Sequence, residues 1–198
     1  PKVVTQLEST TYPVVLKAPM NAGGQGHLIL NSGELSDRES NWLAKHDKFI
    51  QEPWLEKVCD WGQQIMVYAN GGRYLGLSRF VTDDQGQLNY FILNNPQANL
   101  DDDTIRTLNG YGSKSKSYFA ILQKARDFAI NRLVSLGYQG PAGIDAFIFK
   151  YEGEFYLRPL VEINSRYTFG HIALALEDLI AKGSSATWRF MHRKYLNP

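Results

Sequence analysis

The sequence lacks several features that mark whole classes of proteins. Its 198 residues include one cysteine, Cys59, so no disulfide forms within the chain, and we expect a reducing, cytoplasmic compartment. We expect no signal peptide, and no apolar run approaches the ~20 residues that cross a bilayer, so we expect no membrane partner. The 21 basic and 20 acidic residues leave a net charge of +1, which disfavours a nucleic-acid partner. The four histidines have no metal-ligand spacing, which excludes the common zinc motifs.

The chain does have enough apolar residues, 43% of the total, for one large domain or two small lobes. Strand patterns dominate, and turn residues join most of them into antiparallel pairs. The helical patterns stand apart: Ser36 and Glu39 form a capping box, and apolar residues from Leu122 to Leu136 recur at helical spacing. This segregation predicts an α+β fold. We expect strands over 12–17, 27–30, 49–52, 63–69, 73–81, 88–93, 144–151 and 154–164, and helices over 37–46, 118–136 and 172–181.

Two further segments have a distinctive composition. Residues 94–117 are polar and predict a long loop, in which Arg106, Lys114 and Lys116 are candidates for contacting an anionic substrate. A solvated loop without such a role is the alternative. Residues 188–195 are basic and aromatic, which favours an amphipathic helix packed on the body or on a partner chain.

A lysine at the end of an apolar strand begins the first candidate site. Lys17 follows β-branched and large apolar residues, and a lysine there is costly unless an anion receives it. The loop after it carries Gly23, Gly24 and Gly26, whose backbone N–H groups can approach a phosphate closely. It is neither a P-loop nor a Rossmann turn, because no Gly-Lys-Ser/Thr follows and the loop leads into a strand. Phosphate binding is one interpretation, and a flexible hairpin with an exposed lysine is the other.

The second candidate lies where a predicted strand ends at Pro53. Beyond this proline, backbone donors and acceptors are left unpaired, and these can meet the edge of an adenine ring. Trp54 and Leu55 can pack against the face of such a ring. An ordinary strand end is the alternative.

The third candidate is a set of oxygen-bearing side chains on two neighbouring strands. Glu162 and Asn164 are two residues apart, so they project from one face of a strand, and we expect Asp145 beside them on the preceding strand. Two carboxylates and an amide oxygen suit Mg²⁺, which prefers hard oxygen ligands and also takes phosphate oxygens. Arg166 is in phase with them and offers a planar fork for a phosphate group. A solvated strand face with a salt bridge is the alternative.

Taken in order, these segments resemble the motifs of the ATP-grasp superfamily, which includes biotin carboxylase, D-alanine–D-alanine ligase and related carboxylate–amine ligases. The resemblance rests on Lys17, the glycine loop, Glu-Pro-Trp-Leu at 52–55, Asp145 and Glu-Ile-Asn-Ser-Arg at 162–166. It implies two α+β lobes whose antiparallel sheets grip a nucleotide. We expect an N-terminal lobe over 1–52, with a glycine-rich lid hairpin, and a C-terminal lobe over 53–198, with the Mg-binding strands.

The resemblance also implies a role for each residue. Lys17 would contact the α- and β-phosphates, and Arg166 would steady the transferring phosphoryl group, so these two are the catalytic candidates. Asp145, Glu162 and Asn164 would hold one or two Mg²⁺ ions, with Mn²⁺ as a second candidate ion. The remaining nucleotide contacts would be Gly23, Gly24, Gln25 and Gly26 in the lid, Glu52 and Leu55 at the adenine edge, Trp54 against its face, and Asp60 at the ribose hydroxyls.

The activity implied by the resemblance is ATP-dependent ligation of a carboxylate to an amine or a thiol through an acyl-phosphate. A grasp-type kinase acting on a hydroxyl and a non-catalytic ATP-binding module are the alternatives. The expected partners are ATP, a small carboxylate, an amine acceptor and an N-terminal region of the same protein, since the family's substrate lobe and second phosphate-binding lysine would precede Pro1. The oligomeric state stays open, with a homodimer as one candidate.

One spacing departs from the family pattern. Asp145 and Glu162 are 17 residues apart, which is longer than usual, and Leu157-Arg158-Pro159-Leu160 is the expected insertion. Pro159 has no N–H to donate to a strand neighbour, so it predicts a bulge or an edge strand. The insertion leaves the register of Asp145 against Glu162 open.

Overall fold

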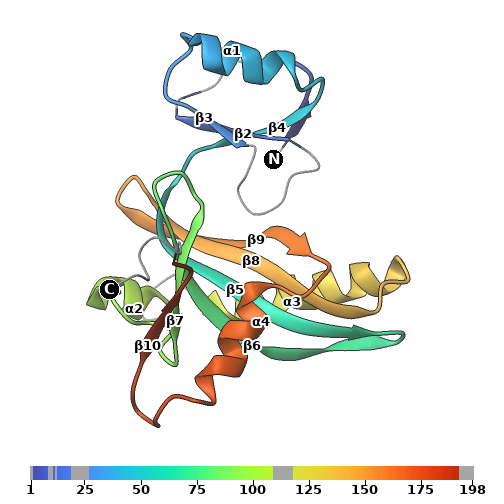
Figure 1. The fold of residues 1–198 in the computed structure, drawn as a ribbon, viewed down its shortest axis with the longest axis vertical. Helices are drawn as coiled ribbons and strands as arrows, with labels where there is room; N and C mark the ends of the chain where they lie inside the picture. Colours follow the sequence, from blue (N-terminus) through green and yellow to red (C-terminus); the bar gives the residue numbers. More distant parts are fainter. Residues whose placement is uncertain (1, 9–10, 12, 19–26, 109–117, 192–198) are drawn as a thin grey trace. The chain divides into compact units, whose positions relative to one another are not determined.

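The protein divides into two compact units, each built around a sheet. The computed structural model describes residues 2–8, 11, 13–18, 27–108 and 118–191. Unit 1 comprises Pro1–Glu56 and Thr82–Leu88, and unit 2 comprises Lys57–Val81 and Asn89–Pro198. Figure 1 shows sheets with few helices, which confirms the α+β prediction. The lobe limits expected from the sequence stay a prediction. No helix among the described residues is long and apolar enough to cross a membrane.

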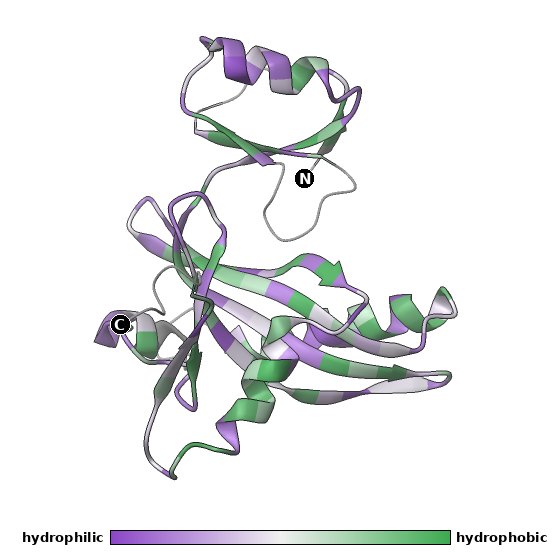
Figure 2. Cartoon of the chain, in the orientation of Figure 1, coloured by the Kyte–Doolittle hydropathy of each residue, from purple (hydrophilic) through white to green (hydrophobic). Residues whose placement is uncertain are grey.

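Unit 1 is a four-stranded antiparallel sheet with one helix, α1 (Asp37–Ala44). The helix begins at the predicted capping box, where Ser36 N donates to the Glu39 carboxylate at 2.6 Å. Hydrophobic residues concentrate on the strands of this unit, whereas α1 is mostly hydrophilic (Figure 2). The strands, in sheet order, are β1 (Lys2–Val4), β4 (Phe49–Pro53), β2 (Val14–Lys17) and β3 (His27–Leu30). Their core comprises Val4, Val14, Leu16, Leu28, Leu30 and Phe49, with Trp42 and Leu43 packed against it.

Unit 2 is organised by a six-stranded sheet. In sheet order its strands are β10 (Ala186–Arg189), β7 (Leu88–Leu93), β6 (Gly71–Thr82), β5 (Glu56–Tyr68), β8 (Gly140–Tyr151) and β9 (Glu154–Asn164). The pairs β5–β6, β8–β9 and β7–β10 are antiparallel. The predicted turns between β5 and β6 and between β8 and β9 are therefore confirmed, and β9 forms one edge of the sheet.

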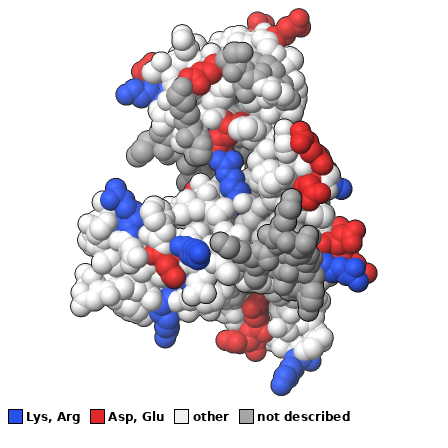
Figure 3. All heavy atoms as spheres, turned by 180° about the vertical axis from the view of Figure 1, so that it is seen from behind, with Lys and Arg blue, Asp and Glu red and all other residues white. Residues whose placement is uncertain are grey.

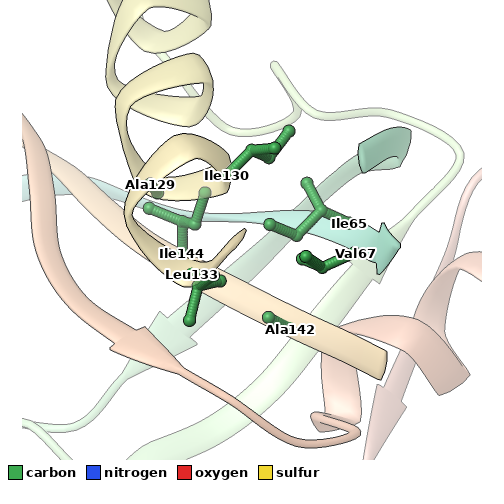
Figure 4. Packing of buried hydrophobic residues seen from close by; sticks show 7 residues of the cluster. All are labelled: Ile65, Val67, Ala129, Ile130, Leu133, Ala142 and Ile144. Carbon is green, nitrogen blue, oxygen red and sulfur yellow. The ribbon is translucent and has the colours of Figure 1, made fainter. Parts of the chain in front are cut away.

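Helix α3 (Tyr118–Ser135) covers one face of this sheet. Figure 4 shows its residues Ala129, Ile130 and Leu133 packed against Ile65, Val67, Ala142 and Ile144 of β5 and β8. Gly137 follows the helix with a φ of +73°, the left-handed conformation typical of a glycine at a helix C-terminus. The expectation that Leu136 belongs to the apolar face is wrong, since its side chain is 63% exposed beyond the last helical turn.

Several segments differ from the sequence-based expectation, among them β1, which was not predicted, and β8, which begins at Gly140. Helix α2 (Asp102–Leu108) lies inside the stretch predicted to be a loop, and Asp101 caps it by accepting from Thr104 N at 2.7 Å. The segment expected to be an amphipathic helix begins instead as β10, because Ala186–Arg189 pair with Tyr90–Leu93 of β7. Helix α4 (Phe169–Glu177) begins after Thr168, earlier than predicted. Strand β5 also begins earlier, at Glu56.

Charged side chains of both signs are interspersed over the face shown in Figure 3, in keeping with the net charge of +1. Among the described residues, the buried charged side chains are Glu52, Asp60 and Arg79. A buried charge is costly unless it is paired, so the partners of these groups indicate where polar chemistry is concentrated.

Candidate functional site

The first candidate pair lies in unit 1 on adjacent strands. Val15 of β2 is opposite Glu52 of β4, so Lys17, two residues after Val15, projects from the same face as Glu52. Lys17 Nζ donates to Glu52 Oε2 at 2.7 Å. The Glu52 side chain is 6% exposed and that of Lys17 is 35% exposed. An ammonium has three N–H donors, so this contact positions Lys17 while leaving donors for a second anion such as a phosphate.

Trp54 packs within unit 1 against the turn between β6 and β7. Its backbone N–H donates to Pro13 O at 2.9 Å, and its ring lies 3.0 Å from the position of a Cβ added at Gly86. The ring of His27 is 6.3 Å away from that of Trp54. Leu55 is half-buried. The adenine contacts expected of Trp54 and Leu55 stay a prediction.

The glycine loop lies between two strands that pair as predicted. β2 and β3 are antiparallel, with Lys17 opposite His27, which confirms the hairpin. Gly23, Gly24, Gln25 and Gly26 lie outside the described residues. Their role as a lid over phosphates stays a prediction.

The third candidate set is brought together by β8 and β9. Asp145 is directly opposite Glu162, and Gly143 is opposite Asn164. Asn164 Nδ2 donates to Asp145 Oδ2 at 3.1 Å and to Glu162 Oε1 at 2.8 Å. The three predicted ligands therefore converge, and the Asn164 amide lies between the two carboxylates.

This register is preserved by a bulge in β9. Asp145 pairs with Glu162 but Phe147 pairs with Arg158, so residues 159–161 occupy the length that β8 spans with Ala146 alone. Pro159 lies in this bulge and β9 is an edge strand, as its missing N–H predicts. The insertion is thus absorbed locally, and the Asp145–Glu162 pairing is kept.

Negative charge accumulates around Asp145. Burial, the charge of Glu162 with its hydrogen bond, and the charge of Asp60 together raise the pKa of Asp145 to about 8, while the hydrogen bond from Asn164 acts in the opposite direction. The carboxyl group therefore holds a proton at neutral pH in the protein alone. A cation bound between the carboxylates would reverse this effect, because it favours their charged forms.

Asp60 and its neighbours extend this polar region onto β5. Lys57 Nζ donates to both carboxylate oxygens of Asp60, at 3.1 and 3.2 Å. Arg79, buried on β6, donates from Nη1 to Asp60 O at 3.3 Å and to Phe80 O at 2.8 Å, whereas its buried Nε has no hydrogen-bond partner among the described residues. Asp60 thus lies close enough to Asp145 to shift its pKa. The ribose contact expected of Asp60 stays a prediction.

Arg166 lies just beyond the end of β9, next to the predicted ligands. Its Nη2 donates to Asn164 Oδ1 at 3.2 Å, and its Nη1 donates to Tyr167 O at 3.4 Å. The guanidinium therefore holds the amide oxygen of Asn164, while the amide nitrogen faces the carboxylates. Arg166 is exposed, so its other donors are available to a ligand.

A buried amide fastens α4 to the sheet behind these residues. Gln64 is 2% exposed, donates from Nε2 to Ser78 Oγ at 3.1 Å and accepts from Thr168 Oγ1 at 2.7 Å. A Cβ added at Gly170 would lie 2.2 Å from Gln64 Nε2, so only glycine allows this approach. His171 completes the helix start by accepting from Thr168 N at 3.2 Å, and burial lowers its pKa, so the ring stays neutral. The first turn of α4 is therefore fixed relative to β5 and β6.

Solved structures share this arrangement of sheets. The chain is 17% identical to biotin carboxylase from Campylobacter jejuni in complex with β,γ-ATP, with a TM-score of 0.54 over 84% of this chain and 34% of that one. The chain has the ATP-grasp fold. Two further ATP-grasp structures have TM-scores of 0.50. L-amino acid ligase from Bacillus licheniformis is 13% identical, and the match covers 84% of this chain and 35% of that one. The biotin carboxylase domain of Hydrogenobacter thermophilus 2-oxoglutarate carboxylase with MgADP is 16% identical, and the match covers 92% of this chain and 38% of that one.

The chain spans about a third of the length of these ATP-grasp structures, 34% for the Campylobacter jejuni biotin carboxylase. No protein-family model matches the sequence, and no curated protein matches it. At such low identity the comparisons establish the fold, and the activity of the whole protein is a matter for proposal.

Sequence reasoning missed the residues that support the ATP-grasp strands. Gln64 and Ser78 are buried, and Thr168 joins them to α4. A signal was present, because Gln63 and Gln64 lie in the middle of an apolar strand and buried amides require partners. Gln63 finds its partner in Leu122 O of α3, at 3.1 Å. Strand periodicity places the two side chains on opposite faces of the sheet, but it did not show that Gln63 bonds to α3 and Gln64 to the start of α4.

The donor set fits a divalent cation only with the amide included. Among the described residues, no group of three or more His, Cys, Asp or Glu side chains could hold a metal ion. Asp145 and Glu162 supply two carboxylates, and turning the Asn164 amide by about 180° would direct Oδ1 toward them. Hard oxygens with uncompensated negative charge suit Mg²⁺, which takes its remaining ligands from water and phosphate.

Proposed function

We propose that the protein is an ATP-dependent ligase joining a carboxylate to an amine or a thiol, and that this chain is its Mg-ATP-binding portion. One observation carries the proposal: Asp145, Glu162 and Asn164 converge on paired strands of an ATP-grasp fold, with Arg166 beside them. The similar structures support it, because they include a biotin carboxylase, an amino acid ligase and a domain bound to MgADP.

In the proposed reaction, a substrate carboxylate oxygen attacks the γ-phosphorus of ATP, and ADP leaves. The nitrogen or sulfur of the acceptor then attacks the acyl carbon, loses its proton, and expels phosphate. Bound Mg²⁺ would offset the negative charge on the phosphate oxygens.

The side chains of this chain have separate tasks. Asp145, Glu162 and Asn164, with its amide turned, would hold the cation. Arg166 donates to oxygens of the transferring phosphoryl group from its exposed guanidinium, which stabilises the charge that develops there. Lys17, positioned by Glu52, donates to the α- and β-phosphate oxygens.

Calorimetric titration of ATP tests this proposal, first with Mg²⁺ and then with EDTA. We expect Mg-dependent binding by the wild type, and a loss of affinity of about 100-fold for Glu162→Gln. Lys17→Ala should also bind more weakly. Glu154→Gln is the matched control, because Glu154 lies on the same strand but at the exposed turn, opposite Tyr151.

Binding that is equal in EDTA, or equal in Glu162→Gln and the wild type, would show that the metal site is placed wrongly. With binding established, the full-length protein is screened with pairs of carboxylates and amines. An amide or thioester product assigns the ligase activity. A stable phosphate ester would assign a kinase instead, and ATP binding without any product would indicate a non-catalytic module.

A further inference from the structure

A cationic and aromatic cluster adjoins the carboxylates on the same face of β8 and β9. Phe147 is the next residue of β8 on the face of Asp145, and it pairs with Arg158. The guanidinium carbon of Arg158 lies 5.9 Å from the centroid of the Phe147 ring. Lys57 Nζ lies 6.0 Å from the same centroid. One aromatic ring is therefore flanked by two cations, a single strand step away from the proposed metal ligands.

The bulge in β9 decides which residue takes this position. If the register of Asp145 with Glu162 continued without a bulge, Leu160 would stand opposite Phe147. With the bulge, Arg158 takes that place, and Leu160 packs into the apolar cluster beneath α3. The insertion thus replaces an apolar side chain by a guanidinium on the ligand-bearing face.

The position suits one half of a bound nucleotide. Two residues along a strand span about 7 Å, roughly the distance from a metal-bound phosphate to the sugar of the same nucleotide. Lys57 reaches the same ring and follows the predicted adenine segment at 52–55 by two residues. The sugar and base therefore belong at Phe147, on the side of the cluster away from Asn164.

We propose that Arg158 is a specificity-determining residue that contacts the ribose and base of the nucleotide, an inference that rests on the proposed function. A guanidinium is planar and weakly hydrated, so it can stack on a heterocyclic base while donating hydrogen bonds to ring nitrogens or ribose oxygens. Phe147 supports the guanidinium from one face, which limits its freedom before the nucleotide arrives.

Calorimetry with two ligands tests the assignment: Mg-ATP, and Mg-tripolyphosphate, which has the phosphates but neither sugar nor base. Arg158→Ala should bind Mg-ATP roughly 10-fold more weakly and Mg-tripolyphosphate as the wild type does. Arg158→Lys should fall between them, because it keeps the charge but not the planar fork. Arg189→Ala is the matched control, since Arg189 also lies on a strand beside an aromatic ring, 5.3 Å from the centroid of Tyr90, but away from the carboxylates of β8 and β9.

The outcomes separate this inference from the function on which it rests. Loss of Mg-ATP binding in Glu162→Gln but not in Arg158→Ala leaves the function standing and overturns the inference. Equal weakening of both ligands by Arg158→Ala overturns it too, because the guanidinium then serves the phosphates. Failure of the wild type to bind Mg-ATP overturns both. If Arg158→Ala unfolds, Arg158→Met keeps the aliphatic stem and answers the same question.

Discussion

The carboxylates of the two units are compensated in different ways. In unit 1, buried Glu52 accepts the ammonium of Lys17 at 2.7 Å, so one negative charge meets one positive charge. In unit 2, Asp145 faces Glu162 beside the neutral Asn164 amide, and Asp145 can ionise only next to the negative charges of Glu162 and Asp60. The first arrangement is balanced within the protein, whereas the second carries a surplus of negative charge once Asp145 ionises above about pH 8.

This difference indicates which charged residues are compensated by other groups of the folded protein and which require a bound ligand for compensation. The Lys17–Glu52 pair gains stability from its own charges, so its removal should be felt as instability. Bringing the carboxylates of unit 2 together costs free energy. The β8–β9 pairing and the packing of α4 on the sheet nevertheless keep them close. A cluster that is unfavourable without a cation and favourable with one is typical of a binding site.

The largest effect should come from removing the surplus charge. Asp145→Asn should stabilise the metal-free protein at pH 9 by on the order of 3 kcal/mol, and should abolish Mg-dependent ATP binding. The raised pKa of Asp145 sets the sign: the native state holds a proton that the unfolded state loses above about pH 4. Stability of the wild type therefore falls as pH rises from about 4 to about 8, and the Asp145→Asn substitution removes that slope.

Urea unfolding in EDTA at several pH values measures this slope, and Glu154→Gln is the control. Equal slopes for Asp145→Asn and the wild type would show that the carboxylates are compensated already. The contrast between the units would then not hold.

The second effect should appear in unit 1 with the opposite sign. Lys17→Ala deprives buried Glu52 of its ammonium partner and should destabilise the protein by about 2 kcal/mol at pH 7. Glu52→Gln on this background should restore most of the loss, because it removes the uncompensated charge. Thermal unfolding of the single and double variants measures the coupling, with exposed Lys48→Ala as the control. A Lys17→Ala variant as stable as the wild type would show that the ion pair contributes nothing.

The smallest effect should come from the amide between the carboxylates. Asn164→Asp adds a carboxylate beside Asp145 and Glu162 and removes two donated hydrogen bonds, so it should cost about 1–2 kcal/mol without metal. Millimolar Mg²⁺ should recover this loss more fully than it stabilises the wild type. Unfolding curves with and without Mg²⁺ measure both quantities. The metal site would be refuted if Mg²⁺ left the stability of Asn164→Asp unchanged.

The sequence predicted best those features that depend on neighbouring residues in the chain. The Ser36–Glu39 capping box, the β8–β9 hairpin and the bulge at Pro159 follow from local backbone chemistry. Helix α2 was missed because Asp101 caps it inside a polar stretch where periodicity is weak. The strand at Ala186–Arg189 was missed because pairing with β7, distant in sequence, overrides local preference.

Within the candidate site, the same division holds. The two-residue spacing of Glu162 and Asn164 predicted their common face with Asp145 beside them, and the structure pairs Asp145 directly with Glu162, a register that the sequence left open. Arg158 could not be placed in advance, because the extent of the bulge decides whether it or Leu160 faces Phe147. Register is a cooperative property of two strands, and one strand's sequence does not specify it.

The division of the chain into units has a consequence for dissecting it. The chain passes from unit 1 to unit 2 after Glu56, returns at Thr82, and leaves again after Leu88. Residues 82–88 include Gly86, which packs under Trp54, and Gln85, whose carbonyl hydrogen bonds with His27. A fragment ending at residue 56 would therefore lack part of its own packing, and a single proteolytic cut would not release either unit. A recombination that exchanges unit 1 between proteins would therefore have to transfer residues 82–88 together with residues 1–56.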